Sequence, residues 1–367
     1  MITLIFAFYY EDVDPGNCGT YSSITSSKDS LFVSYYDIDD GDLKLAWKVG
    51  DNPWHYTTVD TVGDVGMFTS IYNYRGTLWI SYYDNTNGDL KCATGSGTDF
   101  NIELVDQTGN VGMYSSIVVR NGIPHIFYYD ATNGDLKHAY KTSGVWETEV
   151  IDNRNDCGLW TSAFLDENGD IYITYYSQTS NDLHVAIING TLTICTVSEG
   201  GKYSSVAVAD DGTIHMAFLG PSGSLLHAYG LPPSFTVDTV DATPQAGYWT
   251  DIVLDQYGNP IISYVLSLTY DYTNVARFTG SWELYTMVDT IAGSNGTSIT
   301  LIGEDVCLSY FKGYPINGLR VMFFPQLGVS EPPEEPVKNK GVFDVLGRPG
   351  GQGRIIFKNG KKIIILK

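Results

Sequence analysis

The sequence contains no apolar run long enough to cross a bilayer as a helix, and no stretch with apolar residues at helical spacing over three turns. It also lacks GxSxG, HExxH, P-loop and dinucleotide-binding motifs, as well as WD40 and kelch signatures. These absences argue against membrane insertion as a helix, against an all-α fold, and against enzyme classes defined by those motifs. We therefore expect an all-β protein without membrane insertion.

Positive charge is scarce and is concentrated at one end. The chain has 21 Lys and Arg against 42 Asp and Glu. Residues 331–367 carry eight basic and four acidic side chains, so residues 1–330 have a net charge of −25. A body of this charge repels nucleic acid and anionic membranes, whereas neutral or cationic ligands are compatible with it.

The five cysteines do not form a disulfide framework. Cys18 and Cys157 take equivalent positions in distant repeats, and Cys92, Cys195 and Cys307 fall in separate predicted strands. No CxxC pair suggests zinc, so we expect five free thiols.

What the chain does contain is a repeat, best seen in GMYSSIVVRNGIPHIFYYDATNGDLKHA at residues 112–139. Seven copies begin at 43–47-residue spacing: Gly19, Gly66, Gly112, Gly158, Gly201, Gly247 and Ser294. Each copy reads as four short strands, rich in Tyr, Val, Ile and Thr, with turn residues between them. This period and strand count predict an all-β, seven-bladed β-propeller with four antiparallel strands per blade.

The seventh copy lacks its fourth strand, because the pattern reaches Pro325 after three strands. The missing segment occurs at the start of the chain, where residues 8–14 align with residues 54–60. The N-terminal segment also lacks a basic leader and a cleavage site, which favours structure over a signal peptide. We predict that it pairs with Gly318–Phe324 and closes the ring of blades.

Composition divides the chain into a propeller at 1–325, a Pro- and Glu-rich linker at 326–340 and a C-terminal β tail at 341–367. The propeller resembles bacterial secreted repeat proteins built from a HIxYYDxxNGDLKxA unit. The tail resembles the C-terminal sorting domain of type IX (Por) secretion, through Asp344, Gly347, Arg348, Gly353, Phe357, Gly360, Lys361, Lys362 and Lys367. The resemblance implies a secreted or cell-surface protein. The alternative is a terminal hairpin that packs on the propeller.

One aromatic residue recurs two positions after the opening glycine in six of the seven copies. The members of this set are Tyr21, Phe68, Tyr114, Trp160, Tyr203 and Trp249, and blade seven has Gly296 instead. If they point into the channel mouth, they form a ligand-binding ring for sugar rings or other flat apolar faces. The alternative is ordinary packing between blades. Small residues follow each aromatic, as expected where seven innermost strands converge on one axis.

Carboxylates also recur with the repeat. Asp14, Asp60, Asp106, Asp152, Asp241 and Asp289 are expected to end fourth strands, and Asp37, Asp84 and Asp130 to end second strands. They suit either turn stabilisation or, as an alternative, Ca²⁺. His125 and His215 are equivalent, as are His138 and His227, which indicates a repeat role and not a catalytic dyad. Blades five to seven depart most from the consensus and could hold one specialised pocket.

These features predict a lectin-like binding or adhesion module, monomeric and without a cofactor, that recognises glycan or a surface protein through its loop face. The alternative is a propeller glycoside hydrolase or polysaccharide lyase, which would need a singular pair of carboxylates. The Asp positions instead recur with the repeat, so no catalytic residue is assigned. A purely structural surface component is the third possibility.

Overall fold

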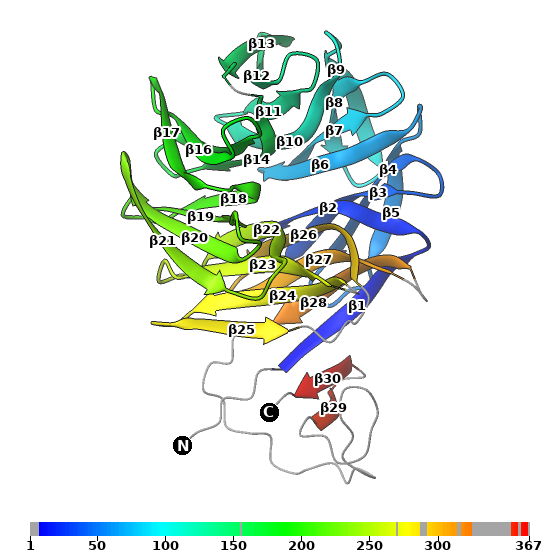
Figure 1. Ribbon diagram of the computed structural model, residues 1–367. Helices are drawn as coiled ribbons and strands as arrows, with labels where there is room; N and C mark the ends of the chain where they lie inside the picture. Colours follow the sequence, from blue (N-terminus) through cyan, green and yellow to red (C-terminus); the bar gives the residue numbers. More distant parts are fainter. Residues whose placement is uncertain are drawn as a thin grey trace.

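The computed structural model describes residues 7–154, 156–268, 271–286, 292–313 and 317–324, together with two strands near the C-terminus. Every regular element in these residues is a strand, and seven antiparallel sheets are arranged around a common axis (Figure 1). The protein is a seven-bladed β-propeller, as the repeat predicts. No helix in this part of the chain is long and apolar enough to span a membrane.

Blades one to six are each one continuous four-stranded meander, ordered from the axis outwards. Blade one comprises β2 (Cys18–Ser27), β3 (Ser30–Asp37), β4 (Asp42–Val49) and β5 (His55–Asp60). Blade two comprises β6 (Val65–Tyr74), β7 (Thr77–Asp84), β8 (Asp89–Ser96) and β9 (Asp99–Asp106). Blade three comprises β10 (Val111–Arg120), β11 (Ile123–Asp130), β12 (Asp135–Thr142) and β13 (Val145–Asp152).

The next three blades follow the same order. Blade four comprises β14 (Cys157–Leu165), β15 (Ile171–Ser177), β16 (Asp182–Ile188) and β17 (Leu192–Glu199). Blade five comprises β18 (Lys202–Val208), β19 (Ile214–Leu219), β20 (Leu225–Leu231) and β21 (Ser234–Asp241). Blade six comprises β22 (Ala246–Leu254), β23 (Pro260–Ser267), β24 (Asp271–Phe278) and β25 (Trp282–Thr286).

Blade seven joins the two ends of the propeller. It contains β26 (Ala292–Ile302), β27 (Asp305–Lys312) and β28 (Gly318–Phe324), and β1 (Ala7–Pro15) is its fourth strand. β1 pairs antiparallel with β28, from Tyr9 opposite Phe323 to Pro15 opposite Gly318. The predicted closure by the N-terminal strand is therefore confirmed.

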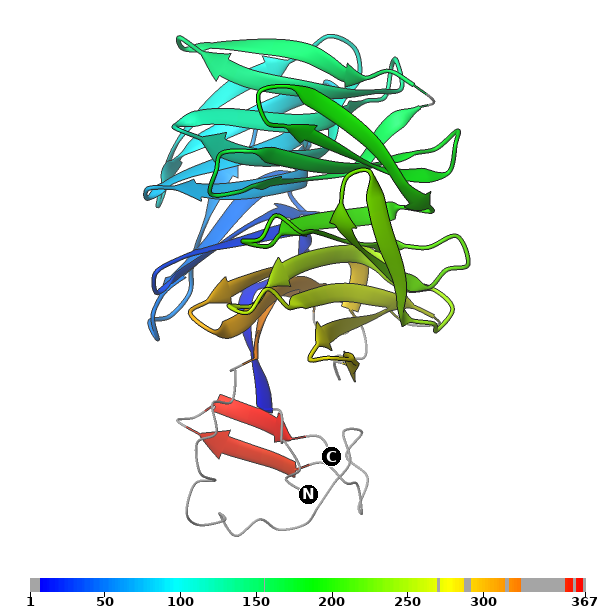
Figure 2. The same cartoon turned by 90° about the vertical axis from the view of Figure 1, so that its left-hand side faces the viewer.

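The C-terminal strands extend this last sheet. β29 (Arg354–Lys358) and β30 (Lys361–Ile365) form a hairpin, and β30 pairs with the first residues of β1 (Figure 2). The linker predicted at 326–340 and most of the tail lie outside the described residues.

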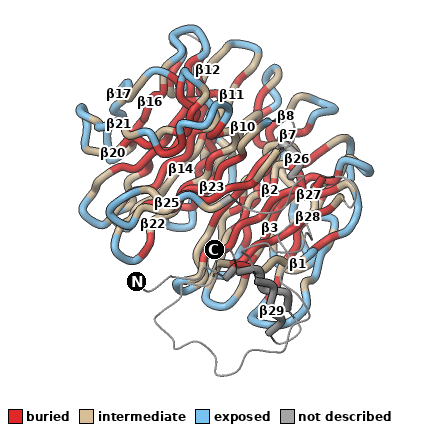
Figure 3. The backbone as a smooth tube through the Cα atoms, turned by 60° about the horizontal axis from the view of Figure 1, so that its bottom comes forward, coloured by how far each residue is buried: buried red, intermediate tan, exposed pale blue. Residues whose placement is uncertain are grey.

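The hydrophobic core lies between the blades. Separate clusters of buried residues fill the spaces between neighbouring sheets, while the turns at the periphery are exposed (Figure 3). Val33, Ile80 and Ile126, at equivalent positions of second strands, have no exposed surface. All five cysteines are free, as predicted, and four of them are buried.

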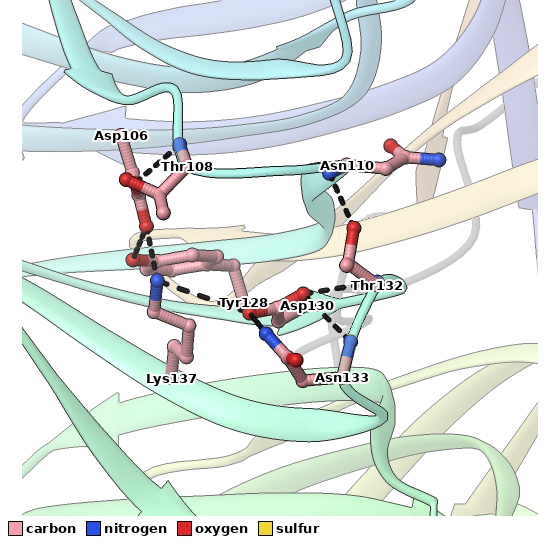
Figure 4. A network of polar contacts seen from close by, with 8 residues as sticks. All are labelled: Asp106, Thr108, Asn110, Tyr128, Asp130, Thr132, Asn133 and Lys137. Atoms are coloured by element: carbon pink, nitrogen blue, oxygen red, sulfur yellow. Dashed lines mark hydrogen bonds and ion pairs between the residues drawn. The ribbon is translucent and has the colours of Figure 1, made fainter.

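Polar side chains also connect the blades, and the repeated aspartates belong to this system. At the junction of blades two and three, Asp106 accepts hydrogen bonds from the Tyr128 hydroxyl at 2.7 Å and from Lys137 Nζ at 2.5 Å (Figure 4). Tyr35 and Lys44 contact Asp14 in the same way, and Tyr82 and Lys91 contact Asp60. We call this Tyr–Asp–Lys contact the junction triad.

The second set of aspartates stabilises turns. Asp130 Oδ1 accepts hydrogen bonds from the backbone N–H groups of Thr132 and Asn133, and Asp37 and Asp84 act alike in their own turns (Figure 4). Turn stabilisation is the use of Asp that the sequence favours over calcium. In the described parts of the chain, no group of three or more His, Cys, Asp or Glu is placed to hold a metal ion.

Candidate functional site at the channel mouth

The six predicted aromatics lie in equivalent irregularities of the innermost strands. In β10 the pairing with β11 shifts register between Met113 and Ser116, so Tyr114 falls in a bulge. The same shift surrounds each of the other five aromatics in β2, β6, β14, β18 and β22. A bulge redirects a side chain away from the normal alternation of the strand.

Each aromatic has a left-handed backbone conformation. The φ angles of Tyr21, Phe68, Tyr114, Trp160, Tyr203 and Trp249 lie between 50° and 56°. A non-glycine residue in this region costs about 1–2 kcal/mol, and bulky residues are seldom found there. The protein therefore maintains six strained residues in order to turn six aromatic side chains in the same direction.

These side chains form a ring around the propeller axis, which we call the aromatic ring. Successive ring centroids are 4.7, 4.6, 5.4, 4.9 and 4.8 Å apart in the order Tyr21, Phe68, Tyr114, Trp160, Tyr203 and Trp249. The last and first members, Trp249 and Tyr21, are 6.2 Å apart. The wider spacing falls where blade seven contributes Gly296 in place of an aromatic.

The aromatic ring lines one cavity of about 420 Å³ along the axis. All six side chains are partly exposed and none is buried in the core between blades. The second tyrosine of each YYD sequence supports the ring from outside, as Tyr129 does for Tyr114 and Tyr83 for Phe68. The sequence thus located the residues that meet at the mouth, and their role in binding stays a prediction.

Beyond the aromatic ring the cavity is lined by small polar residues and by apolar residues such as Ile24, Ile71 and Ile117. Ser23 accepts a hydrogen bond from the N–H of Ile71 in the next blade, Ser70 from Ile117, and Ser116 from Ala163. These contacts link the innermost strands side by side. Below its aromatic mouth the channel wall is therefore a mixture of polar and apolar side chains and is largely uncharged.

Asp251 breaks this pattern, because blade six has a carboxylate where blades one to five and seven have serine. Its Oδ2 accepts hydrogen bonds from Ile299 N and Ser298 Oγ of blade seven, both at 2.9 Å. Its Oδ1 accepts one from Ile252 N at 2.9 Å. Surrounding protein desolvates the carboxylate and raises its pKa to about 6, although the three hydrogen bonds oppose that rise.

Sequence reasoning did not assign Asp251 to the site. The signal was present, because Thr250-Asp251 is the single acidic pair among seven otherwise uncharged small pairs. The depth of this residue in the cavity could be seen only once the innermost strands were placed around the axis.

The four histidines at repeated positions are paired within blades. His125 Nδ1 lies 2.9 Å from His138 Nε2 in blade three, and His215 Nδ1 lies 3.1 Å from His227 Nε2 in blade five. Burial lowers the pKa of His125, His138 and His227 to about 3. His125, His138 and His227 lie away from the axial cavity, in keeping with the predicted repeat role.

A second hollow, of about 870 Å³, opens on the opposite face of the propeller. It is lined mainly by the first turns of blades five and six, including Asp211 and Tyr257. The departure of blades five to seven from the repeat consensus favours one specialised pocket among them, and residues of all three blades line this hollow. Its Asp211 and Asp255 accept hydrogen bonds from backbone N–H groups of their own turns.

No protein-family model and no curated protein sequence matches this chain. Solved structures that are similar in fold include the following three. A protein of unknown function from Dyadobacter fermentans is 11% identical, with a TM-score of 0.53, over 86% of this chain and 97% of its own. The SapL1 lectin, solved in complex with alpha methyl fucoside, is 11% identical, with a TM-score of 0.51, over 72% and 95%.

The third is the polysaccharide lyase Uly1, which is 10% identical with a TM-score of 0.53, over 84% of this chain and 90% of its own. At such identities the likeness extends to the fold alone. The class that fold and site define is a β-propeller with an aromatic-lined axial cavity.

Proposed function

We propose that this protein is a carbohydrate-binding module that holds its ligand at the aromatic ring. The observation that carries the proposal is the ring itself, six aromatic side chains around a single cavity. Aromatic faces pack against the apolar faces of sugar rings, and hydroxyl groups at the site fix the orientation. The fold likeness to the SapL1 lectin, solved with a fucoside, is consistent with this assignment.

The strain in the ring supports a binding role over simple packing. Blade seven completes the propeller with Gly296 at this position, so an aromatic is not needed to form a blade. Six bulky residues in the left-handed region are instead expected where function selects their direction.

Binding is favoured over catalysis. Hydrolysis or elimination needs at least two groups that exchange protons in distinct environments. Among the residues that line the axial cavity, Asp251 is the single carboxylate, and the tyrosines keep their protons because burial raises the pKa of Tyr21, Tyr114 and Tyr203.

The propeller also fits a secreted or cell-surface setting, with glycan or a surface protein as partner. This part of the proposal rests on the resemblance of the tail to a type IX sorting domain and on the −25 charge of residues 1–330. Fusing residues 326–367 to a reporter in a type IX-competent bacterium would test it, and a reporter retained inside the cell would contradict it.

The test of binding uses Trp160→Gly, which gives blade four the glycine of blade seven, and Tyr257→Ala as matched control. Tyr257 is 77% exposed on the opposite face, so it samples non-specific aromatic stickiness. The affinity of Trp160→Gly for polysaccharides, measured by retention on a panel, should be about tenfold lower than that of wild type. This corresponds to the loss of about 1.4 kcal/mol of stacking. The control should bind as wild type does.

If Trp160→Gly and wild type are retained equally, the aromatic ring is not the binding site. If the protein is retained on no polysaccharide, the proposed function is refuted. New reducing or unsaturated ends in the bound fractions would show catalysis and contradict the proposal. Thermal melting of each variant checks that the fold is intact.

A further inference from the structure

The two departures from sevenfold repetition at the channel lie on the same side. The first is Gly296, which contributes no aromatic side chain, so that Trp249 and Tyr21 on either side of it have the widest centroid spacing in the ring, 6.2 Å; we call this spacing the gap. The second is Asp251, whose Oδ2 is held by Ser298 and Ile299, two and three residues beyond Gly296. The gap and the carboxylate therefore share the interface of blades six and seven.

The depth of Asp251 follows from its strand. It comes two residues after Trp249 along β22, on the side of the aromatic ring that leads into the channel. Both residues line the same cavity. A group that enters through the mouth therefore meets Asp251 as the one charged residue of the lining.

The carboxylate keeps capacity for one more donor. A carboxylate has about four lone-pair positions, and the three hydrogen bonds from Ile252, Ile299 and Ser298 occupy three of them. Those donors are backbone N–H groups and a hydroxyl, so none of them neutralises the charge. A purely structural hydrogen bond between innermost strands needs only a serine hydroxyl, as Ser23, Ser70 and Ser116 show in other blades.

The electrostatic surroundings favour a cation. No Lys, Arg or His is among the lining residues, which apart from Asp251 are uncharged. Lys202 Nζ lies at the rim, 5.9 Å from the Trp160 ring centroid, and its repulsion of a second cation is opposed by the negative charge of Asp251. With neighbouring centroids 4.6–6.2 Å apart, a group on the axis lies about 5 Å from each ring, within the roughly 6 Å reach of cation–π attraction.

We propose that the axial site selects a sugar that carries a free ammonium group, an unacetylated amino sugar, with Asp251 as the specificity residue. This inference rests on the proposed function and names its ligand class. The pyranose packs on the aromatic ring, and its ammonium group enters beside Gly296 to donate a hydrogen bond to Asp251. The buried charge of Asp251 is thereby neutralised only when the ligand is bound.

The test compares a glucosamine oligosaccharide with an N-acetylglucosamine oligosaccharide of equal length, by titration calorimetry at pH 7. Wild type should bind the amino sugar about tenfold more tightly, and Asp251→Ser, which copies the other blades, should bind both alike. Asp211→Ser on the opposite face removes the same charge and should keep the wild-type preference. Asp251→Ser retains a hydroxyl that can accept the hydrogen bond from Ile299 N of the next blade. Thermal melting checks that the variant is folded.

Acidification gives a second measurement. As the pH falls through 6, Asp251 takes up its proton and the preference should shrink in wild type, while Asp251→Asn shows no such change. The tyrosines that line the cavity keep their protons in this range, because burial raises the pKa of Tyr21, Tyr72, Tyr114 and Tyr203.

A preference that survives in Asp251→Ser, or a wild type that prefers the acetylated sugar, would overturn the inference. If the protein binds other polysaccharides but neither of the two test sugars, the inference is overturned and the proposed function stands. Absence of binding to any glycan would refute both.

Discussion

At the scale of single residues, one carboxylate is repeatedly shared between two blades. In each junction triad the Asp ends the fourth strand of one blade, and the Tyr and Lys come from the next blade. The Lys and Tyr hydrogen bonds outweigh burial and lower the pKa of Asp60 and Asp106. Burial, followed by the contact with the Asp carboxylate, raises the pKa of Tyr82 and Tyr128. The first tyrosine of YYD is thus fixed by a polar contact inside an otherwise apolar junction.

The buried histidines predict a pH-dependent stability. Folded His125, His138 and His227 stay neutral to about pH 3, and the pKa of His215 is also lowered, whereas unfolded histidines gain protons near 6.5. Below pH 6.5 the unfolded state therefore binds more protons, and the free energy of unfolding falls. Asp251, with its raised pKa, acts in the opposite direction between about pH 4 and 6.

Urea unfolding at pH 7, 6, 5 and 4 measures this slope. The double variant His125→Phe/His138→Leu gives blade three the residues of blade one, Phe32 and Leu45. Removing two such sites should reduce the slope by up to about 2.7 kcal/mol per pH unit, since each proton contributes about 1.4 kcal/mol per unit. A slope equal to that of wild type would show that these histidines are not neutral in the fold.

At the scale of elements, β1 is the strand that closes the ring of blades. It covers the free edge of β28, and Val13 packs with Leu319 and Val321 in the core between blades seven and one. The junction triad is also completed across the closure, through Asp14. Contacts between sequence ends thus close the propeller without any covalent link.

A complementation experiment tests this closure. A chain lacking residues 1–15 should lose cooperative unfolding, because an edge strand and a junction core are exposed together. A synthetic peptide of residues 7–15 added in excess should restore a cooperative transition, whereas the same peptide with Val13→Asp should not. Cooperative unfolding of the truncated chain alone would contradict the role assigned to β1.

The sequence predicted these strands well, because the same pattern of strand and turn residues occurs seven times. Seven copies of one pattern defined the blades, and the missing fourth strand of the last copy predicted the place of β1. Features that depend on one residue were harder to see. The carboxylate of Asp251 interrupts a series of serines, yet its place under the gap at Gly296 depends on how β22 and β26 approach the axis. The partners of Asp106 come from the following blade, and no local pattern indicates them.

At the scale of the whole molecule, the aromatic ring implies a single axial site. Sites built from repeated loops would occur several times around the propeller, whereas an axial cavity occurs once. The loop-face carboxylates of blades one to three are engaged in turns and junction triads, which argues against a separate site in every blade.

The stoichiometry of binding is therefore the decisive property of the intact protein. Calorimetric titration with a short oligosaccharide should give one site per chain, and Trp160→Gly should weaken that site without changing the number. A chain with one site cannot cross-link while it is monomeric, so protein that sediments as a monomer should bind an immobilised polysaccharide yet fail to precipitate the same polysaccharide in solution. Two or more sites per chain, or precipitation by a protein that sediments as a monomer, would place the ligand at the repeated loops. In that case binding should survive Trp160→Gly and decline stepwise as single blades are altered.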